Sequence, residues 1–151
     1  MVRIVKTDAS QSDFKKLVAL LDGDLAERDG EDHSFYDQFN KLHLIKYALV
    51  AYEKDLPVAC GAIKEFEPEV MEIKRMYVTP KKRGEGIATK VLSALENWAR
   101  ELGYQKCVLE TGKRQPEAIA LYTKNGYQII PNYGQYAGIE NSVCFEKYVS
   151  V

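Results

Sequence analysis

The stretch Thr79–Leu92, TPKKRGEGIATKVL, joins an apolar strand-like segment to a helix-like one. The predicted helix opens with three consecutive cations, Lys81–Arg83, although a helix N-terminus already carries roughly half a positive charge from its aligned peptide dipoles. Gly84 and Gly86 add a second cost, because glycine inside a helix is about 1 kcal/mol less favourable than alanine. An anion bound at this point would offset both costs.

The order strand, turn, glycines, helix presents several unpaired backbone N–H groups at the helix start. Glycines let such groups approach a phosphate closely, and the cations flank it, so the stretch predicts a phosphate or pyrophosphate site. A glycine-rich connector whose lysines face solvent is the alternative. A Walker A loop needs a lysine and a hydroxyl residue where this chain has Ile87 and Ala88. A dinucleotide fingerprint needs a third glycine where it has Thr89, so neither motif fits the stretch.

The composition fits one globular domain spanning residues 1–151, with 46% hydrophobic residues to fill a core. The formal net charge of -1 leaves no global basic field for nucleic acid. No segment approaches the ~20 apolar residues of a membrane span, and the segment MVRIVKTDAS has no apolar run long enough for a secretion signal. We therefore expect a cytoplasmic protein that binds neither nucleic acid nor a membrane.

Cysteine and histidine spacing gives no sign of a metal site. Cys60, Cys107 and Cys144 lie far apart in apolar strand-like runs without CxxC spacing, and we interpret them as buried reduced thiols. His33 and His43 have no ligand spacing around them, so no metal is expected.

Hydrophobic periodicity predicts a chain of both strands and helices. The expected strands span 2–6, 44–52, 58–65, 70–78, 106–110, 127–130 and 141–148, with EKDLP as a hairpin turn between the second and third. The expected helices run from a Ser10/Asp13 capping box to near Gly23, through Phe35 and Phe39, from Gly84 to Leu102, and from Pro116 to Lys124. A strand meander followed by alternating strands and helices predicts an α/β chain of the mixed α+β kind, a mixed sheet with helices on both faces.

A series of motifs surrounds the glycine-rich turn. Arg83-Gly84-Glu85-Gly86-Ile87-Ala88 is preceded by EIKRMYVTP and followed by Glu110-Thr111, by AIALYTKNGY (118–127) and by NSVCFEK (141–147). The first motif resembles the Q/R-x-x-G-x-G/A signature of the GNAT superfamily of acetyl-CoA-dependent N-acetyltransferases. The others are similar to that family's fourth strand, second cofactor motif and last strand. The resemblance implies the acyl-CoA N-acyltransferase (GNAT) fold, a mixed, mostly antiparallel sheet of about seven strands that splays between strands 4 and 5.

The resemblance also implies acetyl-CoA as the cosubstrate. Its pantetheine arm would enter between the splayed strands and pair with backbone groups of Met76 and Val78, with the pyrophosphate on the turn from Arg83 to Ala88. The implied cofactor-binding residues are Met76, Tyr77, Val78, Arg83, Gly84, Glu85, Gly86, Ile87, Ala88, Gln115, Ala118, Tyr122 and Asn125. Gln115 stands where the family often has an asparagine.

Acetyl transfer requires a neutral amine. Because an ordinary alkylammonium has a pKa near ~10.4, presenting the free base at pH 7 costs about 4.6 kcal/mol, and a proton acceptor would help. Strand alternation places Glu72 on one face with Lys74, Met76 and Val78, barring a bulge, and some members of the resembling family have a general base at this position. Glu110 is the second candidate. Either glutamate could act through a water, or be only a solvated or ion-paired strand residue.

The resemblance implies that Tyr122 meets the departing thiolate. A phenol pKa of ~10 exceeds the ~8.5 of a thiol, so full proton transfer would be uphill by roughly 2 kcal/mol. We therefore expect Tyr122 to stabilise the thiolate by a hydrogen bond. Packing with Leu121 in the core is the alternative.

The acceptor is expected to be a primary amine of a small molecule or peptide. Six acids, Asp22, Asp24, Glu27, Asp29, Glu31 and Asp32, would attract a cationic amine unless they form a solvated loop. Tyr133 and Tyr136 could wall the acceptor pocket. The predicted function is an N-acetyltransferase, monomeric or homodimeric, in which the amine attacks directly in a ternary complex. A non-catalytic acyl-CoA-binding regulatory module is the alternative.

Overall fold

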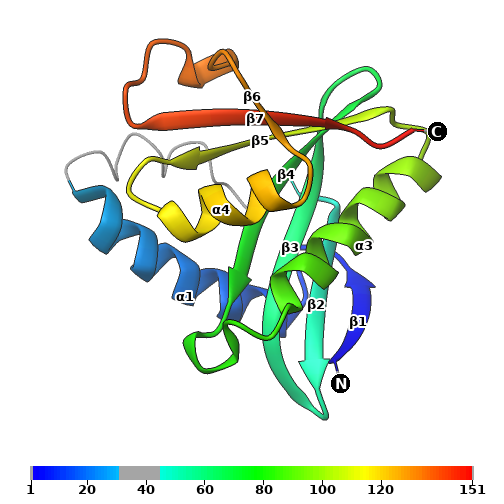
Figure 1. Cartoon of the computed structure of the whole chain (residues 1–151). Helices are drawn as coiled ribbons and strands as arrows, with labels where there is room; N and C mark the ends of the chain where they lie inside the picture. The colour runs from blue at the N-terminus through cyan, green and yellow to red at the C-terminus, as the bar shows by residue number, and fades with distance from the viewer. Residues whose placement is uncertain (1, 31–44, 151) are drawn as a thin grey trace.

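The computed structural model describes residues 2–30 and 45–150 and contains a seven-stranded sheet (Figure 1). The strands are β1 (Val2–Thr7), β2 (Tyr47–Glu53), β3 (Leu56–Glu67), β4 (Val70–Val78), β5 (Lys106–Gly112), β6 (Gln128–Ile130) and β7 (Ser142–Tyr148). They lie in the order β1-β2-β3-β4-β5-β7-β6, and β4 and β5 are the parallel pair. This confirms the predicted mixed, mostly antiparallel sheet. The expected helix through Phe35 and Phe39 lies outside the described residues.

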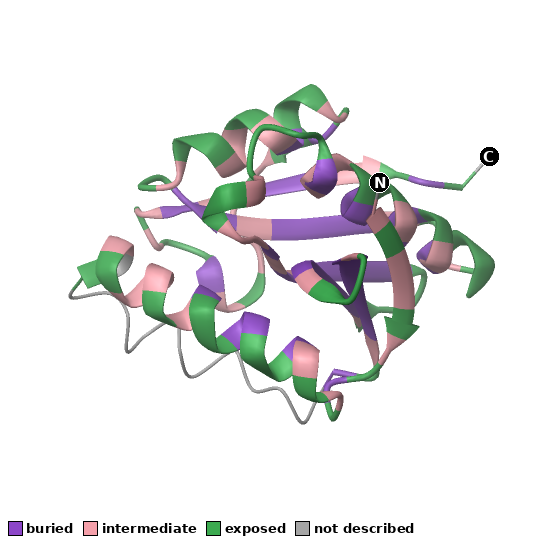
Figure 2. Cartoon of the chain, turned by 90° about the horizontal axis from the view of Figure 1, so that it is seen from below, coloured by how far each residue is buried: buried purple, intermediate pink, exposed green. Residues whose placement is uncertain are grey.

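Helices cover both faces of the sheet, as predicted (Figure 1). The described helices are α1 (Ser12–Asp29), α3 (Ile87–Glu101) and α4 (Pro116–Lys124), with short 3-10 turns η3 (Pro80–Lys82) and η4 (Gly134–Tyr136). The buried face of α1 packs on one side of the sheet, and α3 and α4 pack on the other. Figure 2 shows this as buried positions along the central strands and on the sheet-facing side of the helices.

No helix in the described part of the chain is long and apolar enough to cross a membrane.

Helix α1 differs from its predicted bounds at both ends. Gln11, not Ser10, caps it, because the Gln11 side chain accepts a hydrogen bond from the Phe14 N–H at 2.7 Å. The helix also continues past Gly23 to Asp29. Leu21 is buried and Leu25 packs beside it one turn later, and burial of this stripe outweighs the about 1 kcal/mol cost of glycine. The predicted end near Gly23 was therefore wrong.

The sheet opens between β4 and β5, as the resemblance implied. The two strands pair over only three positions, from Val70↔Lys106 to Glu72↔Val108. Beyond this point β4 continues to Val78 paired with β3, and β5 continues to Gly112 paired with β7. The C-terminal halves of β4 and β5 therefore diverge and leave an opening between them.

A bulge in β4 sits at this opening. Arg75 has a φ of 60°, in the left-handed region, and the register against β3 shifts between Cys60 and Ala62. An extra residue in one strand reverses the alternation of the side chains that follow it. The side chain of Arg75 consequently joins the α1 face, where it forms an ion pair with Asp22.

The bulge separates residues that simple alternation had placed together. Lys74 is opposite Ala62, a residue of the α1-side core, and Glu72 lies two residues before it on the same face. Met76 and Val78 instead pack against the core on the α3 face. The prediction that Glu72, Lys74, Met76 and Val78 share one face was therefore wrong for the last two.

Candidate active site

A cleft of about 420 Å³ lies between the β4–α3 turn and α4, where β4 leaves β5. It is lined by Met76, Tyr77, Val78, Arg83, Gly84, Gly86, Ile87, Ala88, Gln115, Ala118 and Tyr122, among other residues. These are all of the predicted cofactor-binding residues except Glu85 and Asn125. The fold therefore gathers residues from two distant segments around one opening.

The glycine-rich turn contains left-handed backbone conformations that residues with a Cβ rarely adopt. Gly84 and Gly86 have φ values of 83° and 81°, and a Cβ added at either would meet nothing within 4 Å. Their positive φ, rather than crowding by the protein, is what requires glycine here. The predicted helix start at Gly84 was three residues early, since α3 begins at Ile87. The cations precede the first helical turn and do not lie in it.

The N-terminus of α3 opens into this cleft. Gly86 is its N-cap residue and supplies no side-chain capping bond, and the first helical hydrogen bond runs from Lys90 N–H to the Gly86 carbonyl at 3.2 Å. Ile87, Ala88 and Thr89, which precede that bond, all line the cleft. Uncapped N–H groups at a helix N-terminus suit a phosphate group. Thr89 was not among the predicted cofactor residues.

Arg83 reaches back over the end of β4. Its Nε donates to the Val78 carbonyl at 2.9 Å, and its guanidinium lies 5.5 Å from the centre of the Tyr77 ring. Lys82, the neighbouring cation, forms an ion pair with Glu53 at the end of β2. Lys82 and Arg83 thus place positive charge at the cleft. Arg83 also bonds the backbone carbonyl of Val78, one of the two residues whose backbone was predicted to pair with pantetheine.

Asn125 lies at the C-terminal end of α4, outside the cleft lining. Its Nδ2 donates to the Leu121 carbonyl at 2.8 Å and to Thr89 Oγ1 at 3.4 Å. These contacts tie the end of α4 to the first turn of α3. Its cofactor contact stays a prediction, as does that of Glu85.

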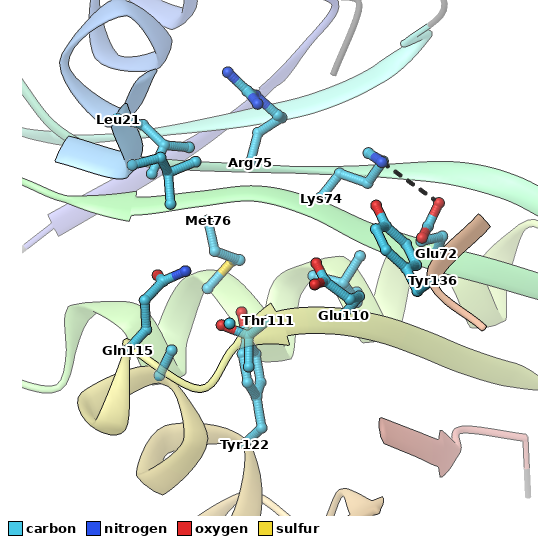
Figure 3. Close-up of a pocket in the computed structure, with 14 residues that line it drawn as sticks. Leu21, Glu72, Lys74, Arg75, Met76, Glu110, Thr111, Gln115, Tyr122 and Tyr136 are labelled. Atoms are coloured by element: carbon cyan, nitrogen blue, oxygen red, sulfur yellow. Dashed lines mark ion pairs between the residues drawn. The ribbon is translucent and has the colours of Figure 1, made fainter. Parts of the chain in front are cut away.

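A second, smaller cavity of about 120 Å³ continues from the cleft toward the α1 face (Figure 3). Its polar lining includes Glu72, Lys74 and Arg75 from β4, and Glu110 from β5. Met76, Gln115, Ala118 and Tyr122 line both cavities. Both predicted base candidates, Glu72 and Glu110, therefore line the same cavity as Tyr122. Because of the bulge at Arg75, residues on one face of β4 line this cavity and residues on the other face line the cleft.

Glu72 is buried, with a hydrogen bond to one carboxylate oxygen and an ion pair at the other. The Tyr133 hydroxyl donates to Oε2 at 2.7 Å, and the Lys74 ammonium lies 3.7 Å from Oε1. Burial, followed by the nearby Glu72 carboxylate, raises the pKa of Tyr133, so this hydroxyl stays protonated and can donate. Tyr136 lines the cavity directly. Both tyrosines that were expected near the acceptor are thus found beside Glu72.

Tyr122 is buried at the junction of the two cavities. Its ring centre lies 5.7 Å from that of Tyr127 and 6.0 Å from that of Phe145, in the core on the α3 face. Burial, and secondarily the charge of Glu110, raises the pKa of Tyr122. The residue therefore both packs in the core and faces the candidate site, so the two alternatives considered for it are compatible.

Part of the acidic segment is neutralised within the protein. Asp22 forms an ion pair with Arg75, whose side chain is only 2% exposed. Asp24 lies 3.5 Å from Arg28, which also pairs with Glu117 in the first turn of α4. Asp22, Asp24 and Arg28 belong to α1, so this part of the predicted acidic loop is helical.

Strand alternation could have identified Lys74 as a residue of the site, but not Arg75. Lys74 lies two residues from Glu72 on the same strand face, and no motif indicated a role for it. The side chain of Arg75 turns toward Asp22 of α1 because of its left-handed backbone, which the sequence does not signal.

Comparison with known proteins identifies the family. Residues 14–127 match the model of the Acetyltransferase (GNAT) family. The chain therefore belongs to the GNAT acetyltransferase family, as its motifs indicated, and this membership implies acetyl-CoA as the cosubstrate. Among the described residues, no group of three or more His, Cys, Asp or Glu side chains is arranged to hold a metal ion.

Two relatives of known sequence match the chain in part. It is 39% identical to the IAA acetyltransferase of Azospirillum brasilense over 100 residues, which are 66% of this chain and 65% of that protein. It is 38% identical to the uncharacterized N-acetyltransferase YjgM of Escherichia coli over 87 residues, 56% of this chain and 52% of the relative. The chain thus matches between half and two thirds of the length of these relatives.

Solved structures share the whole fold. A Klebsiella pneumoniae protein classed with the acyl-CoA N-acyltransferases superposes with a TM-score of 0.83 and 33% identity, covering 99% of this chain and 98% of its own. The PaiA N-acetyltransferase of Thermoplasma acidophilum, solved in complex with coenzyme A, gives a TM-score of 0.73 at 17% identity, covering 98% and 99%. At that identity the second likeness concerns the fold alone.

Proposed function

We propose that this protein is an N-acetyltransferase that transfers the acetyl group of acetyl-CoA to a primary amine of a small molecule or peptide. The amine attacks directly in a ternary complex. The observation that carries the proposal is the junction of two cavities at the strand opening, one starting at the glycine-rich turn and the other containing two carboxylates. A donor in the first and an amine in the second would meet beside Tyr122.

The residues of the cleft fit acetyl-CoA. The N-terminus of α3 and the glycine-rich turn provide backbone N–H groups for the diphosphate, with Arg83 as the nearby cation. The backbone of Met76 and Val78 provides hydrogen-bonding groups for pantetheine along the open edge of β4. Because the Val78 carbonyl accepts from Arg83 in this structure, binding would exchange that contact for one with the ligand. Acetyl-CoA supplies an activated thioester to this site.

Glu72 is our candidate for the group that accepts a proton from the acceptor amine. The Lys74 ammonium 3.7 Å from Glu72 Oε1 supports this role, because it shows that the cavity can hold an amine nitrogen beside this carboxylate. Glu110 lines the same cavity and is the second candidate. A positioned base of this kind accelerates a reaction by about 10²- to 10⁴-fold.

Tyr122 acts as a hydrogen-bond donor toward the leaving sulfur. Its raised pKa makes the phenol a weaker acid, so it keeps its proton and stabilises the thiolate without full proton transfer. This is the same role that the comparison of phenol and thiol pKa values had favoured.

The charge of the smaller cavity favours a cationic amine as acceptor. Among the described residues, two carboxylates, Glu72 and Glu110, line this cavity, and carboxylates attract an ammonium group.

The function is tested by titrating the protein with acetyl-CoA in a calorimeter and then following release of free CoA thiol with a panel of small cationic amines and peptide N-termini. We expect binding in the absence of an amine and thiol release that depends on at least one amine. Binding without release on any amine would contradict the proposal and favour the non-catalytic module.

A further inference from the structure

The acceptor cavity already contains a primary amine that belongs to the protein. Lys74 extends from β4 toward Glu72, and its side chain is only 8% exposed (Figure 3). Glu110 and Tyr122 line the same cavity. The Lys74 nitrogen therefore occupies the kind of position that the proposed mechanism requires of an acceptor amine: inside the cavity, 3.7 Å from the candidate base.

The surroundings of Lys74 also ease its deprotonation. Burial lowers the pKa of Lys74, and the nearby Glu72 carboxylate opposes this effect only in part. The free energy needed to form the neutral amine is consequently smaller than for an exposed lysine. Exposed lysines such as Lys16, Lys90 and Lys113 lack this environment and serve as internal references.

We propose that Lys74 is a self-acetylation site, modified by the protein's own active site when no acceptor amine occupies the cavity. The inference rests on the proposed function, because the donor must be acetyl-CoA held in the adjoining cleft. The two spaces share Met76 and Tyr122, so the cavity that contains Lys74 adjoins the cleft in which the thioester would lie.

The step balances without any further reactant. The neutral Lys74 nitrogen attacks the thioester carbonyl carbon, a C–N bond forms, and the C–S bond breaks. The ammonium form loses two protons in all: one goes to Glu72 and on to solvent, and the other ends on the CoA thiol. The products are an uncharged amide at Lys74 and free CoA.

Modification would change the site in two ways. The added acetyl group would fill part of a cavity of only about 120 Å³, and Glu72 would lose its positively charged partner. We therefore expect protein preincubated with acetyl-CoA alone to lose turnover of an external amine progressively, and protein preincubated together with that amine to lose it more slowly.

The test is to incubate the whole protein with acetyl-CoA without an amine, then map acetylated lysines by peptide mass spectrometry over time. The expected result is that Lys74 is acetylated at least tenfold faster than Lys16, Lys90 and Lys113, because the active site promotes only the first. Tyr122→Phe should slow modification of Lys74 and leave that of the exposed lysines unchanged. Lys74→Arg, which keeps the positive charge, should remove the modification.

Calorimetry on the same samples separates the two proposals. If wild-type protein binds acetyl-CoA and releases CoA on an external amine, yet Lys74 is unmodified or reacts no faster than the exposed lysines, self-acetylation is wrong and the proposed function stands. Equal modification of Lys74 in wild type and in Tyr122→Phe would also overturn it. If acetyl-CoA does not bind at all, both proposals fall. The decisive mapping uses wild-type protein, so it does not depend on the folding of a variant.

Discussion

The phenol of Tyr122 is held at the cavity junction by its aromatic neighbours, so its hydroxyl can be removed without disturbing the ring. Phe in its place keeps the contacts to Tyr127 and Phe145. We expect Tyr122→Phe to lower kcat by roughly 100-fold, the lower end of what loss of a transition-state donor costs, with little change in acetyl-CoA affinity. Steady-state kinetics and calorimetry check this. Tyr148→Phe, at an exposed position, is the matched control, and equal turnover of the two variants would leave Tyr122 as a packing residue.

Replacing each glutamate by glutamine shows which of the two, Glu72 or Glu110, is the base. Glu72→Gln should lower kcat/KM at neutral pH by about 100-fold or more, with partial recovery at high pH, where more of the acceptor amine is already neutral. Glu110→Gln should cost less. Rates measured from pH 6 to about 10 decide the matter, since a larger loss and a steeper pH dependence for the Glu110 variant would assign the base to that residue.

The cysteine thiols make stability depend on alkaline pH. Burial raises the pKa of Cys60 and Cys107 to about 12 and that of Cys144 to about 11. Above about pH 9 the unfolded chain loses thiol protons that the folded protein keeps, so the free energy of unfolding falls as pH rises toward the folded-state pKa values. Each thiol contributes up to about 1.4 kcal/mol per pH unit.

Urea unfolding with reductant at pH 8, 9 and 10 measures this dependence. Cys60→Ala should be less stable at pH 8, yet it should lose about 1 kcal/mol less than wild type between pH 9 and 10. Parallel pH dependence of the two proteins would show that the Cys60 thiol already ionises in the folded state. All three cysteines had been interpreted from their apolar flanks as buried thiols, and the structure confirms this.

At the scale of single residues, the sequence predicted which side chains line the site better than it predicted their contacts with other residues. Tyr122 and both glutamates were identified from motifs, and all three line the smaller cavity. The contact between Tyr133 and Glu72 joins residues 61 positions apart, so no local pattern could reveal it. Arg83 lines the cleft, and its bond to the Val78 carbonyl was not predicted; its contact with a phosphate stays a prediction.

At the scale of elements, two glycines of α1 and of the β4–α3 turn behave in opposite ways. Gly23 lies inside α1 with open space around its Cβ position, and Gly86 has a φ of 81°. Gly23→Ala should raise the free energy of unfolding by up to about 1 kcal/mol. Gly86→Ala should lower it by about 1 to 2 kcal/mol, because a Cβ disfavours the left-handed conformation. Urea denaturation of both variants tests the pair. A neutral Gly86→Ala would show that the turn tolerates another backbone conformation.

Segments with a strong hydrophobic periodicity were predicted with the correct bounds. Predictions failed where the backbone is locally irregular. The bounds of β4 and α4 matched the predicted 70–78 and 116–124, where the apolar pattern is clear and proline marks the helix start. The bulge at Arg75 could not be predicted, because a left-handed arginine has no sequence signature and is stabilised by pairing with Asp22 on a distant helix. The end of α1 was missed for a similar reason, since packing of Leu25 against the core, one turn after Leu21, outweighed a local glycine signal.

At the scale of the whole molecule, the opening between β4 and β5 organises every part of the site. It allows the cleft to reach the smaller cavity, and α1 and α4 are joined across it by the ion pair of Arg28 and Glu117. Periodicity predicted a mixed sheet with helices on both faces, and the family resemblance added the opening between the fourth and fifth strands. Periodicity could not predict this opening, because the parallel pairing of β4 with β5 depends on contacts between distant segments.

The central claim is that the β4–α3 turn binds the diphosphate of acetyl-CoA. Its most direct test is a calorimetric titration of acetyl-CoA into wild type, Arg83→Glu and Lys16→Glu, which makes the same charge change on an exposed face of α1. We predict at least a tenfold weaker affinity for Arg83→Glu, about 1.4 kcal/mol, and unchanged affinity for Lys16→Glu. Equal affinity of all three proteins would contradict the account.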